Sequence, residues 1–185
     1  DLLSKPRQFD LISICVKPID IFLVWKKYKY FSNTFLIEKP GANGICEFSE
    51  ILNEAKYEKK LIFINYEFNY SNITNLLKEK VLDYFNDIKS MKLVWEKPTG
   101  DEGGLEWRLL PHMLAELFFF NPNNLTFSKC TKNNHELLLD GFFNKSPISI
   151  IIKNSKIINH STTINLINGN TLFKNREVLN TMIDY

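Results

Sequence analysis

A lysine and a histidine carry the strongest chemical signals in this sequence. Lys39 lies in the stretch LIEKP, directly after the apolar residues 34–37 and directly before Pro40. His112 lies in the stretch GGLEWRLLPHMLAEL, four residues after Arg108 and four residues before Glu116. An ammonium group stabilises negative charge that develops on an oxygen atom, and an imidazole exchanges protons near neutral pH. The pair therefore favours chemistry on an alcohol or a carbonyl group.

Lys39 is expected at the carboxyl end of a buried parallel strand. Side chains at that end project into the crevice where open α/β sheets bind their ligands, and Pro40 keeps the preceding backbone extended. The competing interpretation is a surface lysine in a turn beside Glu38. A second Glu-Lys-Pro at residues 96–98 shows that the tripeptide alone is not specific.

His112 is expected in the middle of a helix over residues 105–120. The spacing of Arg108, His112 and Glu116 puts all three on one face of that helix, where the charged neighbours can orient the imidazole. The competing interpretation is a solvated stripe with a surface histidine. His135 and His160 lie in turn-like or strand-edge stretches, and we expect no comparable role for them.

The first third of the chain predicts half of a doubly wound sheet. Strands are expected at residues 10–15, 34–37 and 61–64, with helices at 21–31 and 51–60 between them, capped by Asp20 and Ser49. Alternating strands and helices with short connections indicate a parallel α/β unit. Residues 1–65 are therefore predicted to be the carboxyl-terminal half of a Rossmann-like dinucleotide-binding domain.

Residues 66–185 predict an α+β domain for substrate binding and oligomerisation. Two amphipathic helices, at 72–86 and 105–120, accompany alternating segments that are typical of strands. The expected result is an open, mainly antiparallel sheet covered by helices, with strands at residues 89–96, 125–131, 136–143, 148–153 and 162–167.

The composition excludes several classes of function. The chain has 185 residues and a formal net charge of +2, with basic residues spread along it, so we expect no nucleic-acid partner. No apolar run is long enough for a membrane span, and a cytoplasmic protein is expected.

The three cysteines, Cys15, Cys46 and Cys130, form no metal motif and are expected to be reduced and mostly buried. No GxGxxG motif, P-loop, HExxH or GxSxG occurs.

Four stretches, in this order, resemble the Gfo/Idh/MocA family of NAD(P)-dependent oxidoreductases, the group of glucose–fructose oxidoreductase and inositol dehydrogenase. The resemblance covers about residues 1–120, and the stretches are DLLSKPRQFDLISICVKP, FLIEKP, LIFINYEFNYS and GGLEWRLLPHMLAEL.

The resemblance implies that hydride passes between NAD or NADP and a carbinol or carbonyl carbon of a sugar, a polyol or a sugar nucleotide. It implies that Lys39 orients the substrate hydroxyl and that His112 is the general acid/base. Asn65 and Tyr66 would line the substrate side. The residues beside the cofactor would be Cys15, Val16, Lys17, Glu38 and Lys39.

The sequence departs from the family at two positions and at its start. Arg108 and Ala115 stand where the family usually has aspartates. Arg108 can receive a carboxylate or a phosphate, which favours an anionic substrate. Glu116 is expected as a further substrate-binding residue. A first Rossmann half with a glycine-rich loop, roughly 60 to 80 residues, is expected before Asp1. Without it, the sequence does not distinguish NAD from NADP.

Two other classes of function stay open. One is a non-catalytic relative that keeps the fold as a binding or assembly module. The other is a reductase of an imine or a tetrapyrrole. In each case, the open sheet of the second domain predicts a homo-oligomer, because exposed sheets usually need covering.

Overall fold

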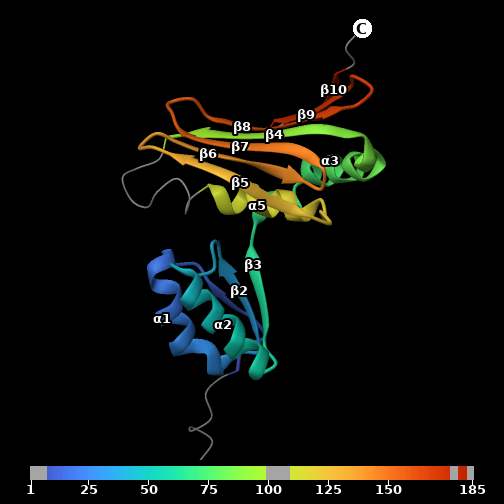
Figure 1. Ribbon diagram of the computed structural model, residues 1–185. Helices are drawn as coiled ribbons and strands as arrows, with labels where there is room; N and C mark the ends of the chain where they lie inside the picture. Colours follow the sequence, from blue (N-terminus) through green and yellow to red (C-terminus); the bar gives the residue numbers. More distant parts are fainter. Residues whose placement is uncertain (1–7, 99–108, 176–178, 183–185) are drawn as a thin grey trace, which may run out of the picture. The chain divides into compact units, whose positions relative to one another are not determined.

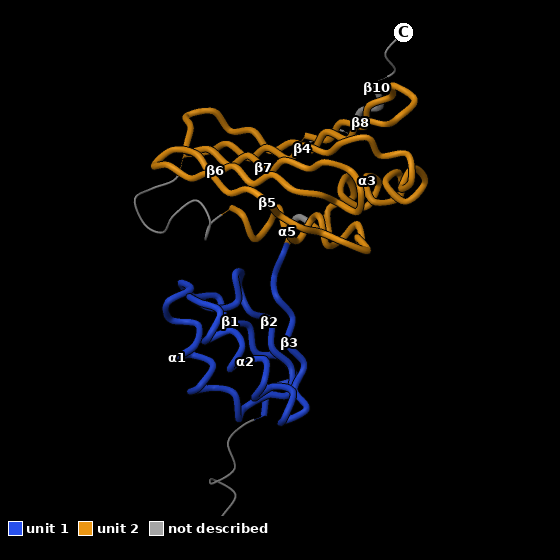
Figure 2. The backbone as a smooth tube through the Cα atoms, viewed as in Figure 1, with its two compact units in different colours: residues 1–66 blue, residues 67–185 orange. Residues whose placement is uncertain are grey.

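The computed structural model of this chain describes residues 8–98, 109–175 and 179–182. These residues form two compact units, residues 1–66 and residues 67–185, which Figure 2 shows in two colours. The sequence placed the boundary one residue earlier.

Unit 1 is a three-stranded parallel sheet with two helices on one of its faces (Figure 1). The strand order is β1 (Ile12–Ile14), β2 (Thr34–Glu38), β3 (Leu61–Asn65), and both pairs of neighbours are parallel. Helices α1 (Pro18–Tyr28) and α2 (Ile45–Tyr57) connect the strands. The predicted partial Rossmann fold is confirmed.

The two helices of unit 1 begin earlier than predicted. Helix α1 begins at Pro18, whose missing N–H is no loss in a first turn, so Asp20 lies inside the helix and does not cap it. Helix α2 begins after Gly44, and Ser49 is an interior residue. The carboxylate of Glu47 accepts a hydrogen bond from the Asn43 backbone N–H at 3.1 Å, which ties the start of α2 to the preceding loop.

Unit 2 is a seven-stranded sheet in the order β10-β9-β8-β4-β7-β6-β5. All neighbouring strands are antiparallel except β4 and β7, which are parallel, so the predicted mainly antiparallel sheet is confirmed. The short strands β9 and β10 were not predicted. The elements are η2 (Glu67–Tyr70), α3 (Asn72–Asp83), η3 (Phe85–Asp87), β4 (Ile88–Lys97), α5 (Leu110–Phe119), β5 (Leu125–Lys132), β6 (Glu136–Phe143), β7 (Ser146–Asn154), β8 (Asn159–Leu166), β9 (Thr171–Asn175) and β10 (Leu179–Met182).

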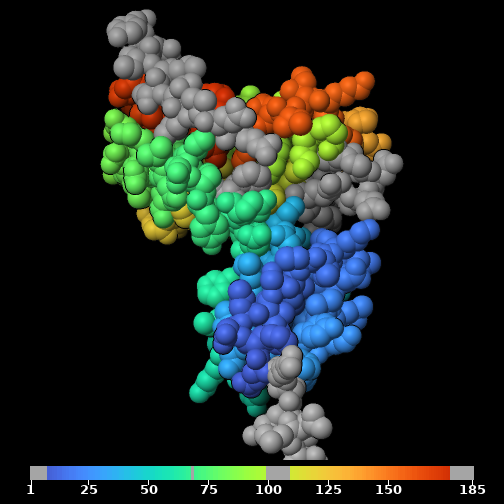
Figure 3. Space-filling view, turned by 180° about the vertical axis from the view of Figure 1, so that it is seen from behind, coloured from blue at the N-terminus to red at the C-terminus, as the bar shows by residue number. Residues whose placement is uncertain are grey.

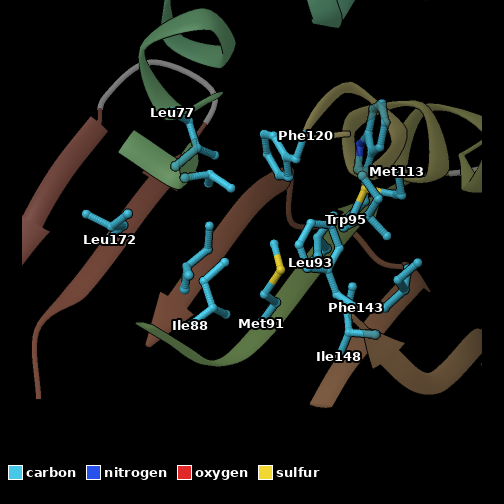
Figure 4. Packing of buried hydrophobic residues seen from close by; sticks show 14 of the residues in the cluster. Leu77, Ile88, Met91, Leu93, Trp95, Met113, Phe120, Phe143, Ile148 and Leu172 are labelled. Carbon is cyan, nitrogen blue, oxygen red and sulfur yellow. The ribbon is translucent and has the colours of Figure 1, made fainter. Parts of the chain in front are cut away.

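Helices α3 and α5 cover one face of this sheet, and the core lies between them and the strands (Figure 1). Figure 4 shows Met113 of α5 and Phe120, just after its end, with Met91, Leu93 and Trp95 of β4. All five side chains are at most 5% exposed. The outward side of α3, green in Figure 3, is part of the surface. The opposite face of the sheet carries no helix within the described ranges (Figure 1).

The cysteines differ from the prediction. Cys15, Cys46 and Cys130 are free thiols, as expected, but all three are exposed. Cys15 follows a strand, Cys46 lies in the first turn of α2, and Cys130 lies on the edge strand β5, where none of the three faces a core. In the part of the chain that the structure describes, no helix is long and apolar enough to cross a membrane, and no cluster of three or more ligating side chains could hold a metal ion.

A carboxylate of α2 joins the two helices of unit 1. The indole Nε1 of Trp25 donates to Glu54 Oε2 at 2.8 Å, and the Lys29 ammonium lies 3.0 Å from the same oxygen. Lys26 contacts the other oxygen. Burial alone raises the pKa of Glu54, but the hydrogen bonds from the lysines and the indole outweigh burial and lower the pKa to about 2.

Replacing Glu54 with glutamine should therefore destabilise unit 1 at neutral pH. The folded-state pKa lies below the ordinary 4.5, so the carboxylate stabilises the fold above about pH 4.5, and this contribution is lost as the pH falls toward 2. We expect Glu54→Gln to lower the free energy of unfolding by on the order of 2 kcal/mol at pH 7 and by much less at pH 3. Denaturant unfolding at both pH values measures this. The control Glu50→Gln breaks an exposed ion pair and should lower the free energy of unfolding by under about 1 kcal/mol. If the free energy of unfolding falls equally in both variants, the carboxylate of Glu54 does not have the stabilising role given to it here.

Candidate functional site

Unit 1 brings the ends of its three strands together at one edge. Because β1, β2 and β3 are parallel and in register, the residues that follow them meet at the carboxyl edge of the sheet. Glu38 and Asn65 are register partners there, and Asn65 Nδ2 donates to Glu38 Oε1 at 2.6 Å. The hydrogen bond fixes both side chains at the edge where the sequence predicts the cofactor and the substrate.

Lys39 begins the turn that follows β2. The N–H of Gly41 donates to the carbonyl of Glu38 at 3.0 Å, which closes the turn. Gly41 has φ = +96°, and a Cβ atom there would lie 2.5 Å from Cε2 of Phe48, so both the backbone conformation and the space require glycine. This turn places the half-buried Lys39 directly after Glu38, whose carboxylate accepts from Asn65.

The remaining predicted residues of unit 1 also lie at this edge. Cys15, Val16 and Lys17 follow β1 and are exposed, and the Cys15 thiol lies 3.2 Å from the hydroxyl of Ser13. Tyr66 follows Asn65 at the end of β3. Their predicted roles beside a cofactor and a substrate stay predictions.

Unit 2 buries the histidine and the carboxylate of α5. His112 is 6% exposed and Glu116 is 1% exposed, so the two residues do not form a solvated stripe. They are one helical turn apart on the face of α5 that packs on the sheet. Arg108, the third residue of the predicted set, lies outside the described residues.

The Glu116 carboxylate joins α5 to two strands. Lys174 Nζ of β9 donates to Oε2 at 2.6 Å, and Thr162 Oγ1 of β8 donates to Oε1 at 2.6 Å. His160 Nε2 lies 3.6 Å from Oε2. Both oxygens are thus engaged inside unit 2, and the predicted substrate-binding role of Glu116 stays a prediction.

These neighbours keep Glu116 charged although it is buried. Burial alone raises the pKa of this carboxyl group, but the contact with His160 and the charge of Lys174 outweigh burial and lower the pKa to about 2. The ammonium of Lys174, itself 3% exposed, supplies the compensating charge. Removing one partner of a buried pair of this kind leaves an uncompensated charge inside the protein, which is strongly destabilising.

Trp95 lies between two imidazole rings. His160 stacks on the indole with a centroid distance of 4.3 Å and an interplanar angle of 9°, and His112 lies 5.2 Å from it at 47°. Sequence reasoning gave His160 no role, because it predicted that this strand begins at residue 162. Strand β8 begins at Asn159, and its alternation puts His160 on the same inward face as Thr162.

A second carboxylate lies beside His112. Oε1 of Glu67 is 4.0 Å from Nε2 of His112. A mostly buried imidazole with a carboxylate on one side and an aromatic ring on another can hold a proton and keep one orientation. That is the arrangement expected of a general acid/base.

Known structures share this fold. The chain is similar to a dehydrogenase from Chromobacterium violaceum, with a TM-score of 0.71 and 14% identity over 94% of this chain and 55% of that one. It is similar to a mutant of KijD10, a 3-ketoreductase from Actinomadura kijaniata in complex with TDP-benzene and NADP, with a TM-score of 0.75 and 8% identity over 94% and 63%. It is also similar to a super-repressor mutant of Gal80p from Saccharomyces cerevisiae, with a TM-score of 0.75 and 14% identity over 94% and 61%.

At these identities the similarity establishes the fold alone. The chain spans 55% to 63% of the length of these three proteins. The sequence matches no protein-family model, and no curated protein matches it. The chain therefore has the fold of dehydrogenases and oxidoreductases, and its own activity is a matter for proposal.

Breaking the buried pair of unit 2 should be costly. Lys174→Met leaves Glu116 charged and buried, and we expect the free energy of unfolding to fall by about 3 kcal/mol. The double variant Lys174→Met/Glu116→Gln should be more stable than Lys174→Met, because it removes the uncompensated charge. Thermal and denaturant unfolding of all variants measures this.

Lys153→Met is the matched control, because it breaks the exposed pair with Glu136 at 3.5 Å. That change should cost under about 1 kcal/mol. If Lys174→Met costs no more than Lys153→Met, the buried pair does not stabilise unit 2.

Proposed function

We propose that this chain is part of an NAD(P)-dependent oxidoreductase that acts on a carbinol or carbonyl carbon of a sugar, a polyol or a sugar nucleotide. The observation that carries the proposal is the environment of His112, which is nearly buried beside Trp95 and 4.0 Å from a carboxylate. The similar structures of a dehydrogenase and of a ketoreductase with bound NADP support it.

In this proposal, Lys39 and His112 have different roles at the substrate oxygen. The Lys39 ammonium, positioned by the turn at the end of β2, donates a hydrogen bond to the hydroxyl and stabilises negative charge on it. His112 takes the hydroxyl proton during oxidation and returns it during reduction. A bound nicotinamide would supply the hydride chemistry.

The carboxyl edge of unit 1 fits the nicotinamide end of such a cofactor. The backbone after β1, at Cys15 to Lys17, and the fixed Glu38–Asn65 pair offer donors and acceptors there. The sequence holds no glycine-rich phosphate loop of the GxGxxG type, so the pyrophosphate needs groups from another segment. An anionic substrate remains part of the proposal through Arg108.

Cofactor binding and turnover by the full-length protein test the proposal. Titration of NADPH and of NADH, followed by their fluorescence, should show saturable binding. With a panel of sugar and polyol substrates, His112→Ala should lower kcat on the order of 10² to 10⁴-fold, and Lys39→Met by a similar factor.

The chain offers matched controls for both substitutions. Lys56→Met and His135→Gln change an exposed lysine of α2 and an exposed histidine of the β5–β6 turn, and both should leave kcat unchanged. If the protein binds cofactor and turns over substrate but Lys39→Met or His112→Ala has no effect, the site is assigned wrongly.

A second candidate is a non-catalytic binding module. The observation that favours it is the similarity to a super-repressor mutant of Gal80p. Saturable binding of a nicotinamide cofactor without turnover of any carbonyl or alcohol substrate would favour this candidate over the enzyme.

We also propose that the uncovered face of the sheet in unit 2 pairs with a second copy. Val94, Ile151 and Leu138 are register neighbours on that face and are partly exposed, so they form an apolar row. Ile151→Lys should reduce the mass measured by light scattering to that of a smaller species, whereas Lys156→Met, in the β7–β8 loop, should not. An unchanged mass in Ile151→Lys removes this interface.

A further inference from the structure

We propose that Glu67 is the carboxylate partner of His112 and acts as a positioning residue for proton transfer. The inference rests on the proposed function, in which His112 is the general acid/base. Glu67 belongs to a different element from His112 and lies 45 residues before it in the chain. No motif in the sequence connects the two residues.

The geometry gives the pair a buried end and an exposed end. Oε1 of Glu67 is 4.0 Å from Nε2 of His112. The His112 side chain is 5% exposed, whereas that of Glu67 is 52% exposed. A proton on the imidazole thus lies beside a carboxylate that is in contact with solvent.

Two hydrogen bonds hold the segment that carries Glu67. Asn69 Nδ2, two residues later in η2, donates to the carbonyl oxygen of Ala115 in α5 at 3.2 Å. At the other end of η2, the Ser71 hydroxyl caps α3 by accepting from the N–H of Thr74 at 3.2 Å. Element η2 is therefore held against the helix that carries His112, and Glu67 keeps its place beside the ring.

Among the described residues, two further titratable groups on the same face of the sheet, Glu116 and His160, contact each other. Glu116, one turn later on α5, has Lys174 and Thr162 on its two oxygens. His160 lies on Trp95 and faces Glu116. The negative charge of Glu116 is thus matched by Lys174, and the charge of Glu67 acts on His112 from η2.

A carboxylate at this distance favours the imidazolium and orients the ring. The carboxylate that α5 itself carries near His112, that of Glu116 one turn later, is paired with Lys174. Glu67 supplies from η2 a second negative charge, 4.0 Å from the imidazole.

Proton titration of the histidines tests this without any substrate. The chain has only three histidines, at positions 112, 135 and 160, so His→Gln variants assign each imidazole signal in an NMR spectrum of the full-length protein. Glu67→Gln should move the titration midpoint of His112 to lower pH by about half a unit or more. Glu67→Asp should restore part of the shift.

The control is Glu79→Gln, which removes an exposed carboxylate of α3 in the same unit. It should leave the His112 titration unchanged, and Glu67→Gln should leave the His135 titration unchanged. An unmoved His112 midpoint in Glu67→Gln overturns the proposal, whatever the turnover of the variant.

Turnover separates this inference from the proposed function. If the protein is an oxidoreductase, the limb of its pH–kcat profile that reports His112 should move with Glu67→Gln in the same direction as the NMR midpoint, with little change in KM. A moved midpoint in a protein without turnover supports the pair and removes the proposed function. A moved midpoint with an unmoved limb, in an active enzyme, overturns the role of Glu67 in proton transfer.

Discussion

The buried charge of Glu116 is the constraint on which unit 2 depends. A carboxylate at 1% exposure is tolerated only if partners replace its water, and here an ammonium and a hydroxyl each donate to it at 2.6 Å. Those partners come from β9 and β8, so the requirement of one side chain fixes helix α5 against two strands. An apolar contact would tolerate sliding between helix and sheet, whereas these hydrogen bonds define one register between them.

The environment of His112 follows from that register. With α5 held in place, the ring of His112 reaches Trp95, and Trp95 in turn stacks on His160, which faces Glu116. The apolar core continues on the same side of the sheet through Met113 and Leu117. The imidazole therefore sits at the border between a rigid core and the half-exposed Glu67, where a group that exchanges protons has both a fixed position and access to solvent.

In unit 1, the parallel strands themselves position the candidate site residues. Parallel strands place the residues that follow them along one edge, so the ends of β2 and β3 meet there, and a hydrogen bond joins Glu38 to Asn65. The positive φ of Gly41 and the lack of space for a side chain there shape the turn that carries Lys39. The fold is similar to that of a dehydrogenase and of a super-repressor mutant of Gal80p, and a fold alone does not define an activity.

The sequence by itself determined the fold class, because apolar runs of period two and apolar stripes of helical period survive in any context. It placed most strands within a few residues of their ends, and it put Lys39 at a strand end and His112 on a helix face shared with Glu116. It misplaced the starts of both helices in unit 1, because Asp20 and Ser49 look like caps but lie inside helices that begin at Pro18 and after Gly44. Only the tertiary structure decided the partners of His112 and Glu116. Glu67, Trp95, His160, Thr162 and Lys174 lie on other elements, and their approach depends on strand order and register, which no local pattern encodes.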